Sequence, residues 1–268
     1  ANKLFMAEGH KIASKKPFPG MFHTARLLWT LYICFTLAEI AVLLLLKLDL
    51  FDALTHALTN VSTGGFSIYD DSIAHYRLSG HSRAWLIECT VIFFMLAGGI
   101  NFFVHYRFWT GNIKALWDTA EMKYFWGILL TGAALICLSR LRSAGLVYTD
   151  TGGASVSGLK AAASHLKDSG FQAVSILTTT GYATRDIASP YFTALARQLF
   201  LTFMVIGGCA GSTSGGFKII RVAILTKLIR VRIFKLNTSR LSRAPLTIDR
   251  KIVEEKEIQL VSILFFIW

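Results

Sequence analysis

Long apolar runs recur along the chain, separated by shorter polar stretches. Four runs are long enough to cross about 30 Å of hydrocarbon as helices. They cover residues 27–46, 85–104, 124–141 and 192–211. A further apolar run, 219–236, carries five Lys or Arg side chains, so we expect a partly buried or interfacial continuation of the fourth span. The last eleven residues, IQLVSILFFIW, are expected to begin another span that is cut off.

Composition supports a membrane protein, because 53% of the 268 residues are apolar and the mean hydropathy is +0.51. The net charge of +12 is concentrated in two segments. Residues 1–26 hold five Lys or Arg against one acidic residue, and residues 217–251 hold ten against one. Since basic loops collect on the cytoplasmic side, we expect both segments inside the cell and no nucleic-acid partner.

Two polar turns of similar composition interrupt the apolar pattern. They read NVSTGGFSIYD at 60–70 and ILTTTGYATRD at 176–186. A shift of 116 residues aligns Thr63 with Thr179 and Gly65 with Gly181. Each turn follows a span and a short half-apolar segment and precedes another span. The sequence therefore predicts two tandem repeats of span, short helix, loop and span.

The short segment before each turn is too short to cross a bilayer, so we expect it to re-enter the membrane. Its first N–H groups would be capped by Asp49 or Asp52 in one copy and by Asp168 or Ser169 in the other. Its C-terminus, which carries about half a negative charge, would then point into the membrane and favour a cation there.

The loops after these helices can supply oxygen ligands to a dehydrated cation. Glycine allows successive carbonyl groups to turn toward one axis, and Ser or Thr hydroxyls add further oxygens. An ordinary turn is the alternative for a single Thr-Thr-Gly, but two copies favour a selectivity filter. The candidate filter residues are Val61, Ser62, Thr63, Gly64, Gly65, Thr178, Thr179, Thr180 and Gly181.

Three strings, VSTGGFS, LTTTGYATRD and above all GGCAGSTSGGFKIIRV (207–222), resemble the Trk potassium uptake family, which is related to the Ktr and HKT transporters. The resemblance implies four such repeats around one pore. This chain resembles the second and third repeats with the start of the fourth, so the first and fourth repeats would be missing and the chain truncated. Gly65 and Gly181 would be two of four glycines that line a potassium filter.

The same resemblance implies the remaining functional expectations. The protein would be the pore-forming subunit of a potassium uptake system in a bacterial inner membrane, with potassium as its substrate and no covalently bound cofactor. A homodimer and a cytoplasmic nucleotide-binding regulator of the TrkA kind would be its partners, beside membrane lipid. Coupling to protons or sodium is left open.

A glycine-rich segment lies at the end of the fourth apolar run. Its five glycines are expected to break the helix, because each costs about 1 kcal/mol relative to Ala. The resemblance implies an intramembrane gating loop formed by Gly207, Gly208, Cys209, Ala210, Gly211, Ser212, Thr213, Ser214, Gly215 and Gly216. A phosphate-binding loop fits poorly, because Phe217 separates Gly216 from Lys218 and no strand precedes. Lys218 and Arg221 would line the cytoplasmic mouth or snorkel to lipid phosphates.

Other polar residues within apolar runs have two possible roles each. The stretch AGGIN at 97–101 is a second helix break or a site of close helix packing. Glu39, Glu88 and His105 would have structural partners rather than carry protons. His56 and His165 are expected in hydrogen-bond networks, because neither has a second ligand at metal spacing. The four cysteines are expected to be packing thiols rather than disulfides.

The predicted fold class is therefore an all-α, multi-pass integral membrane protein of the cell membrane with potassium-channel-like tandem repeats. Its expected parts are a cytoplasmic segment 1–26, a first repeat 27–106, a linker 107–122, a second repeat 123–236, a basic cytoplasmic linker 237–256 and the start of a span at 257–268. No catalytic motif such as GxSxG or HExxH is present, so we expect no enzyme. The alternatives are a sodium-permeable transporter of the same fold and a membrane-anchored protein that binds partners through its basic segment.

Overall fold

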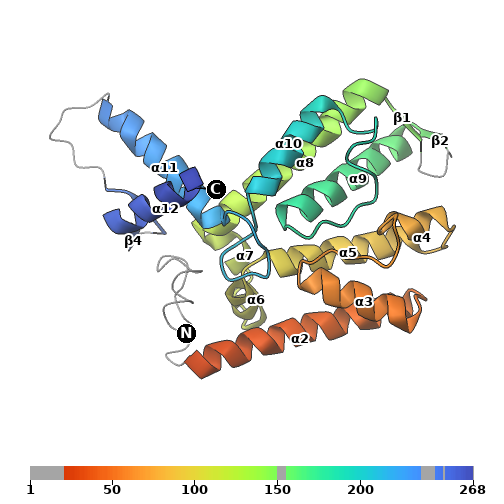
Figure 1. Cartoon of the computed structure of the whole chain (residues 1–268), viewed down its shortest axis with the longest axis horizontal. Coiled ribbons are helices and arrows are strands. Elements are labelled where there is room, and N and C mark those ends of the chain that lie inside the picture. Colours follow the sequence, from red (N-terminus) through yellow and green to blue (C-terminus); the bar gives the residue numbers. More distant parts are fainter. Residues whose placement is uncertain (1–20, 150–154, 237–244, 250, 268) are drawn as a thin grey trace.

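A computed structural model describes residues 21–149, 155–236, 245–249 and 251–267. The expected segment 1–26 and linker 237–256 therefore lie partly outside the described residues. Helices make up most of the described chain, as Figure 1 shows. Their bounds are α2 Met21–Leu45, α3 Leu50–Val61, α4 Ala74–Leu78, α5 Ala84–Gly99, α6 Phe102–Trp109, α7 Ala115–Asp118, α8 Ala120–Ala144, α9 Leu159–Leu177, α10 Ala194–Val205, α11 Ile219–Leu236 and α12 Glu255–Ile267.

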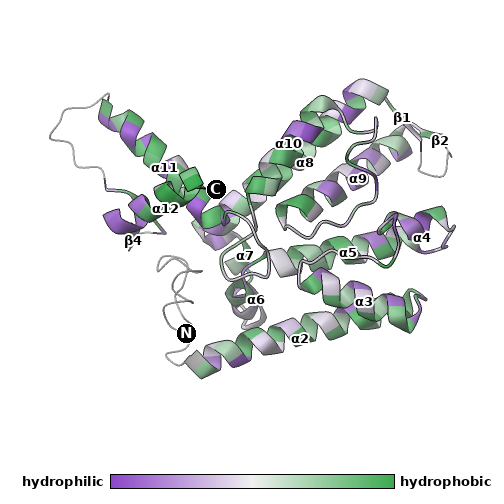
Figure 2. Ribbon diagram, viewed as in Figure 1, coloured by the Kyte–Doolittle hydropathy of each residue, from purple (hydrophilic) through white to green (hydrophobic). Residues whose placement is uncertain are grey.

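The helices form two similar groups. In the first, the short helix α3 packs between the long helices α2 and α5. In the second, α9 packs against α8 and α10, and α9 also contacts α5 of the first group. Each group has the expected order of long helix, shorter helix, loop and helix. Hydrophobic residues recur along these helices (Figure 2), and several large apolar side chains are exposed, such as Trp29, Leu37 and Leu130.

Helix α9 is longer than the sequence pattern indicated. It ends at Leu177, as expected, but it begins at Leu159 and so spans 19 residues. The Ala-rich stretch 159–168 favours helix, and the helix starts directly after Gly158, whose φ is +69°. Asp168 and Ser169 are therefore buried inside the helix, and the expectation that they cap its N-terminus is wrong. In the first copy, Asp49 does occupy the N-cap position of α3, without a side-chain hydrogen bond.

The apolar run 85–104 does not form one straight helix. Helix α5 ends at Gly99, and α6 continues at an angle of 104°. Ile100 is extended, and the Asn101 side chain caps α6 by accepting a hydrogen bond from the Phe103 N–H (2.9 Å). The structure therefore shows the helix break, and it also shows close packing, because a Cβ atom on Gly99 would stand 2.5 Å from Thr178 Cγ2.

The run 192–211 also ends early as a helix, because α10 stops at Val205 and an irregular segment follows. Within the described residues, two helices are long and apolar enough to cross a membrane, Phe22–Leu45 and Ala120–Ala144. The bent pair α5 and α6 would add a third span. Helix α10, with 12 residues, is too short to be counted. The basic run 219–236 is helical as expected, forming α11.

Two short antiparallel hairpins stand beside the helices. β1 (Val147–Thr149) pairs with β2 (Ser155–Ser157), and β3 (Thr247–Ile248) pairs with β4 (Lys251–Ile252). The first hairpin follows α8 and contacts α9. Neither was expected, because both are too short to produce a recognisable strand pattern.

The largest hydrophobic core joins the two groups of helices, with Ile87, Phe171 and Tyr182 among its fully buried members. A separate cluster joins Ala210 and Phe217 of the irregular segment to Leu246 and Ile248 at the β3–β4 hairpin, and to α12. All four cysteines are free, but Cys34 is exposed on α2, so it is not the packing thiol that we expected.

Candidate functional site

The two predicted loops have the same backbone conformation. Each directly follows the last turn of its short helix. Thr63 and Gly65 have positive φ values of +54° and +64°, and the equivalent residues Thr179 and Gly181 have +57° and +95°. A positive φ at Thr is uncommon, so its recurrence at the same place in both copies indicates a specific loop geometry rather than a generic turn.

The same hydrogen bonds hold both loops to their helices. The N–H groups of Gly64 and Gly65 donate to the Thr59 carbonyl (2.7 and 3.0 Å). Those of Thr180 and Gly181 donate to the Ser175 carbonyl (2.9 and 3.2 Å).

This pattern fixes the direction of the carbonyl groups. In a trans peptide the N–H and C=O groups point in opposite directions, and the described chain contains no cis peptide. The carbonyl groups of Thr63, Gly64, Thr179 and Thr180 therefore point away from the helices that hold them. Outward-turned carbonyls in both loops are the oxygen source that a dehydrated cation needs.

Hydroxyl groups beside the loops are already engaged by helix backbone. Ser62 Oγ donates to the Leu58 carbonyl (2.7 Å), and Thr178 Oγ1 donates to the equivalent Val174 carbonyl (2.9 Å). These side chains therefore cap the short helices. Donation uses only the hydroxyl proton, so the oxygen lone pairs of these side chains remain beside the backbone carbonyls.

Tyr182, which follows Gly181, connects the two copies. Its ring is fully buried, and its hydroxyl lies 2.6 Å from Thr59 Oγ1 and 3.2 Å from the His56 carbonyl, both on α3 of the other copy. The equivalent residue of the first loop, Phe66, is 75% exposed. The aromatic residue of one loop thus packs against the short helix of the preceding copy.

The glycine-rich segment lies against the inner ends of both short helices. Thr213 Oγ1 donates to the carbonyls of Val61 (2.9 Å) and Gly98 (3.0 Å). The Gly215 N–H donates to Thr179 Oγ1 (2.7 Å). The predicted gating residues therefore contact both candidate filter loops and the break between α5 and α6.

The ends of this segment are held together. The Gly207 N–H donates to the Phe217 carbonyl, and the Phe217 N–H donates to the Val205 carbonyl, each at 3.0 Å. Lys218 is buried, and its ammonium group donates to the Ser214 carbonyl inside the segment. Arg221 is partly buried, with its guanidinium 5.9 Å from the Phe217 ring. The Lys218 side chain thus reaches back into the glycine-rich segment that precedes it in the sequence.

Glu121 is a residue that the sequence analysis did not identify. It is buried in the first turn of α8, and its carboxylate accepts a hydrogen bond from the Ala210 N–H (2.6 Å). The Ala120 N–H donates to the carboxylate of Asp249 in the β3–β4 turn (2.8 Å). An acidic residue at the start of an apolar run, after the N-cap Thr119, was the only available signal.

The other polar residues that we singled out have protein partners. Glu39 accepts from the Asn60 amide (2.6 Å), and Glu88 pairs with Arg77 (3.3 Å) and Lys167. His105 contacts the Ala97 carbonyl (2.9 Å).

Both short-helix histidines also lie in hydrogen-bond networks. His56 contacts the Asp52 carbonyl (2.8 Å) and Ser67 Oγ (3.2 Å), and His165 contacts the Tyr191 hydroxyl (2.9 Å). In the part of the chain that the structure describes, no group of three His, Cys, Asp or Glu side chains is arranged to hold a metal ion.

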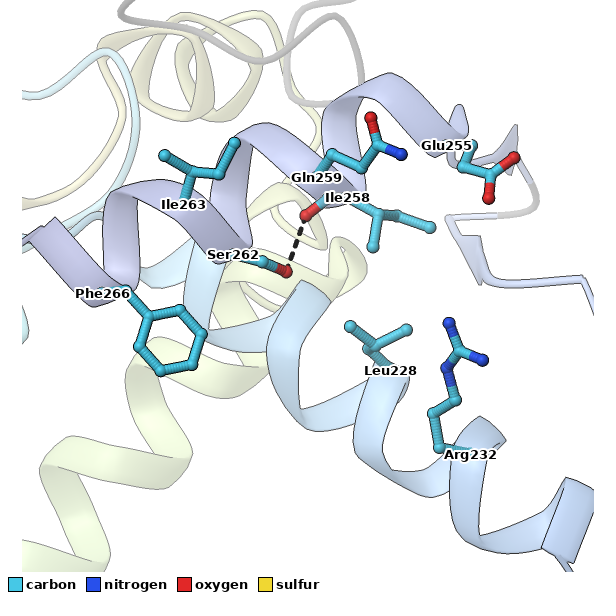
Figure 3. Close-up of a pocket in the computed structure, with 8 residues that line it drawn as sticks. All are labelled: Leu228, Arg232, Glu255, Ile258, Gln259, Ser262, Ile263 and Phe266. Atoms are coloured by element: carbon cyan, nitrogen blue, oxygen red, sulfur yellow. Dashed lines mark hydrogen bonds between the residues drawn. The ribbon is translucent and has the colours of Figure 1, made fainter.

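A pocket between α11 and α12 is separate from the loops (Figure 3). Arg232 and Glu255 lie at one end and Phe266 at the other. Apart from the internal Ser262 bond to the Ile258 carbonyl (2.9 Å), the figure marks no interaction across it. None of the candidate filter or gating residues lines this pocket.

Comparisons with known proteins identify relatives of this chain. A family model described as TrkH, cation transport protein, matches residues 3–268. The chain is 33% identical over 218 residues to the Trk system potassium uptake protein TrkH of Escherichia coli K12, covering 81% of this chain and 41% of that protein. It is 30% identical over 251 residues to TrkG of the same organism, covering 93% and 47%.

A solved structure has the same fold. The crystal structure of the potassium transporter TrkH from Vibrio parahaemolyticus matches with a TM-score of 0.81 and 27% identity, over 98% of this chain and 52% of that one. The expected all-α membrane fold is therefore confirmed. The chain spans about half the length of the relatives that it matches.

Proposed function

Because the chain belongs to the TrkH family of cation transport proteins, we propose that it forms part of the pore of a transporter that takes up potassium across the cell membrane. Its relatives are named potassium uptake proteins. In this proposal potassium is a substrate that passes through, the protein carries no catalytic centre, and an inside-negative potential supplies about 2.3 kcal/mol per charge for each 100 mV.

The single observation that carries the proposal is the shared hydrogen-bond pattern of the two loops. Their N–H groups turn back to Thr59 and Ser175, so their carbonyl groups face away from the short helices. A ring of such carbonyls can replace the hydration shell of potassium. We propose that the residues from Val61 to Gly65 and from Thr178 to Gly181 form two sides of the filter.

The glycine-rich segment Gly207–Gly216 serves as the gate in this proposal. It touches both filter loops through Thr213 and Gly215, so it stands where an ion leaving the filter would pass. Two side-chain hydroxyls, backbone hydrogen bonds and the charged groups of Glu121 and Lys218 hold it, so opening would require these contacts to exchange for others. Lys218 keeps the segment closed by binding the Ser214 carbonyl.

The remaining elements of the pore and its partners complete the proposal. Two loops provide two sides of a four-sided filter, so further span, short-helix and span repeats would close it. A homodimer and a cytoplasmic nucleotide-binding regulator are proposed partners. The regulator would act on the cytoplasmic side through the basic segments that flank α11.

Expression of the protein in its complete natural form tests the proposal. We expect it to restore growth of a potassium-uptake-deficient bacterium at low external potassium and to take up rubidium as a tracer. A protein with Gly64, Thr180 and Gly181 replaced by Ala, which places no new methyl group against the backbone of the other loop, should reach the membrane without restoring growth. Sodium-dependent uptake without potassium uptake would instead support a sodium transporter of the same fold.

A further inference from the structure

A buried ion pair ties the second filter loop to its own short helix. Asp168 lies in the middle of α9, and its side chain is fully buried. Its Oδ2 atom accepts from Arg185 Nε at 2.7 Å and from the Tyr148 hydroxyl at 2.8 Å. Arg185 stands four residues after Gly181, so the pair spans from the helix to the outer end of the loop.

Further contacts fix Arg185 and the residues before it. The Arg185 guanidinium donates to the Thr149 carbonyl at 2.7 Å and lies 4.1 Å from the Tyr191 ring centroid. Arg77 donates to the Thr184 carbonyl at 3.1 Å and also contacts Asp168 at 3.5 Å. The backbone that leaves the second filter loop is therefore held from two sides by charged groups.

The first copy has an equivalent contact between its short helix and its loop, but the donor is a tyrosine hydroxyl instead of an arginine. The 116-residue shift relates Asp168 to Asp52 and Arg185 to Tyr69. Tyr69 donates its hydroxyl to Asp52 Oδ2 at 2.8 Å, and Tyr76 donates to the same oxygen at 3.1 Å. In both copies, a carboxylate on the short helix thus binds the residue four positions after the filter glycine. The donor is charged in the second copy and neutral in the first.

We propose that Asp168 and Arg185 are positioning residues that hold the outer end of the second filter loop and thereby set its preference for potassium over smaller cations. The inference rests on the proposed function. A carbonyl cage discriminates against sodium only while its oxygens stay at the spacing that suits the larger ion, so a loop free to contract loses discrimination. Both contacts have a carboxylate as acceptor, but only Arg185 is itself charged, so attraction between opposite charges in a buried site adds to the hydrogen bond and holds the second loop more tightly than the first.

The experiment compares Arg185→Gln, Asp168→Asn and Tyr69→Phe in the complete protein. We expect Arg185→Gln to lower the ratio of potassium to sodium uptake about tenfold, equivalent to about 1.4 kcal/mol. Tyr69→Phe should lower it less, because the lost hydroxyl carries no charge and Tyr76 still donates to Asp52. Arg185→Lys keeps the charge and should recover part of the ratio.

Arg107→Gln is the matched control. It also removes an arginine from an ion pair, with Asp118 at 3.3 Å, but this pair is exposed and touches neither loop. The control should leave the ratio unchanged. A purely structural role for Asp168 and Arg185 would reduce the amount of folded protein in the membrane and leave the ratio per molecule as in the wild type. That result would overturn the inference.

A second measurement does not require transport. Potassium chloride should raise the midpoint of thermal unfolding of the purified wild-type protein more than sodium chloride does, and Arg185→Gln should abolish this difference. If the wild type takes up no potassium in cells, the proposed function fails. The positioning role fails separately if Arg185→Gln keeps the wild-type difference between the two salts.

Discussion

The carbonyl oxygen of Thr180 lies 1.9 Å from the position that a Cβ atom on Gly65 would occupy. No side chain fits there, because the obstacle is backbone of the other filter loop. Gly181 differs: its φ is +95°, but nothing lies within 4 Å of the position of a Cβ atom. The two equivalent glycines are thus required for different reasons, contact between loops at Gly65 and backbone conformation at Gly181.

For Gly65→Ala we expect loss of potassium uptake together with a lower unfolding temperature. The new methyl group must displace the Thr180 carbonyl, which belongs to the second filter loop. A positive φ adds about 1–3 kcal/mol of strain for a non-glycine residue. Rubidium uptake and thermal unfolding of the purified protein measure the two effects, and a variant with normal uptake would contradict the contact between loops.

Gly181→Ser should keep the protein folded but relax its discrimination against sodium. Space is available for the side chain, so only the backbone of the loop has to adjust. Gly111→Ser is a closely matched control, because Gly111 has the same φ of +95°, equally open surroundings and no contact with either filter loop. Competition of sodium with rubidium uptake is the measurement. Equal sodium competition in the two variants would argue against a filter role for Gly181.

Gly132→Ala should lower stability without changing selectivity. A Cβ atom on Gly132 of α8 would stand 2.1 Å from Phe203 Cζ of α10. Overpacking of this kind costs about 1–3 kcal/mol. Gly127→Ala on the same helix has nothing within 4 Å and should be neutral or slightly stabilising. Thermal unfolding of both variants tests the packing of α10 on α8, which an unchanged midpoint for Gly132→Ala would contradict.

Thr213→Val should weaken the closed position of the gating segment. The change keeps the side-chain shape but removes the hydroxyl that donates to the carbonyls of Val61 and Gly98. The hydroxyl has one proton, which the two carbonyls share, so its loss costs about 0.5–1.5 kcal/mol. We expect faster basal rubidium uptake in the absence of any regulator.

Thr226→Val provides the control for that experiment. The Thr226 hydroxyl donates to the Val222 carbonyl within α11 at 2.8 Å and does not touch the gating segment. Its basal uptake should equal that of the wild type. Slower uptake in Thr213→Val than in this control would show that the hydroxyl supports the open state instead.

The sequence predicted best those features that depend on local turn chemistry. The ends of the short helices at Val61 and Leu177, and the loops after them, follow from hydroxyl and glycine residues next to one another in the chain. The start of α9 was missed because the Ala-rich stretch 159–168 extends the helix toward its N-terminus. The helix therefore begins well before the polar residues that were expected to cap it.

The break after Gly99 depends on contacts that no local pattern contains. The carbonyl groups of Gly98 and Gly99, freed where α5 ends, accept hydrogen bonds from the N–H groups of Thr213 and Cys209 (3.2 and 3.0 Å). These donors come from more than a hundred residues later in the sequence, and the Ala210 N–H that binds Glu121 comes from 89 residues later. Contacts of this kind form only when the two copies pack together.

The packing of the Tyr182 side chain against α3 has a consequence for how the protein assembles. The Tyr182 ring of the second loop completes the core around α3 of the first copy. The unit that folds cooperatively therefore includes parts of both copies and does not coincide with a single sequence repeat. Dividing the gene between the copies, near residue 115, would separate this aromatic from its partner helix. Two polypeptides produced from such a split would each expose an incomplete core and would reach a stable state only by association.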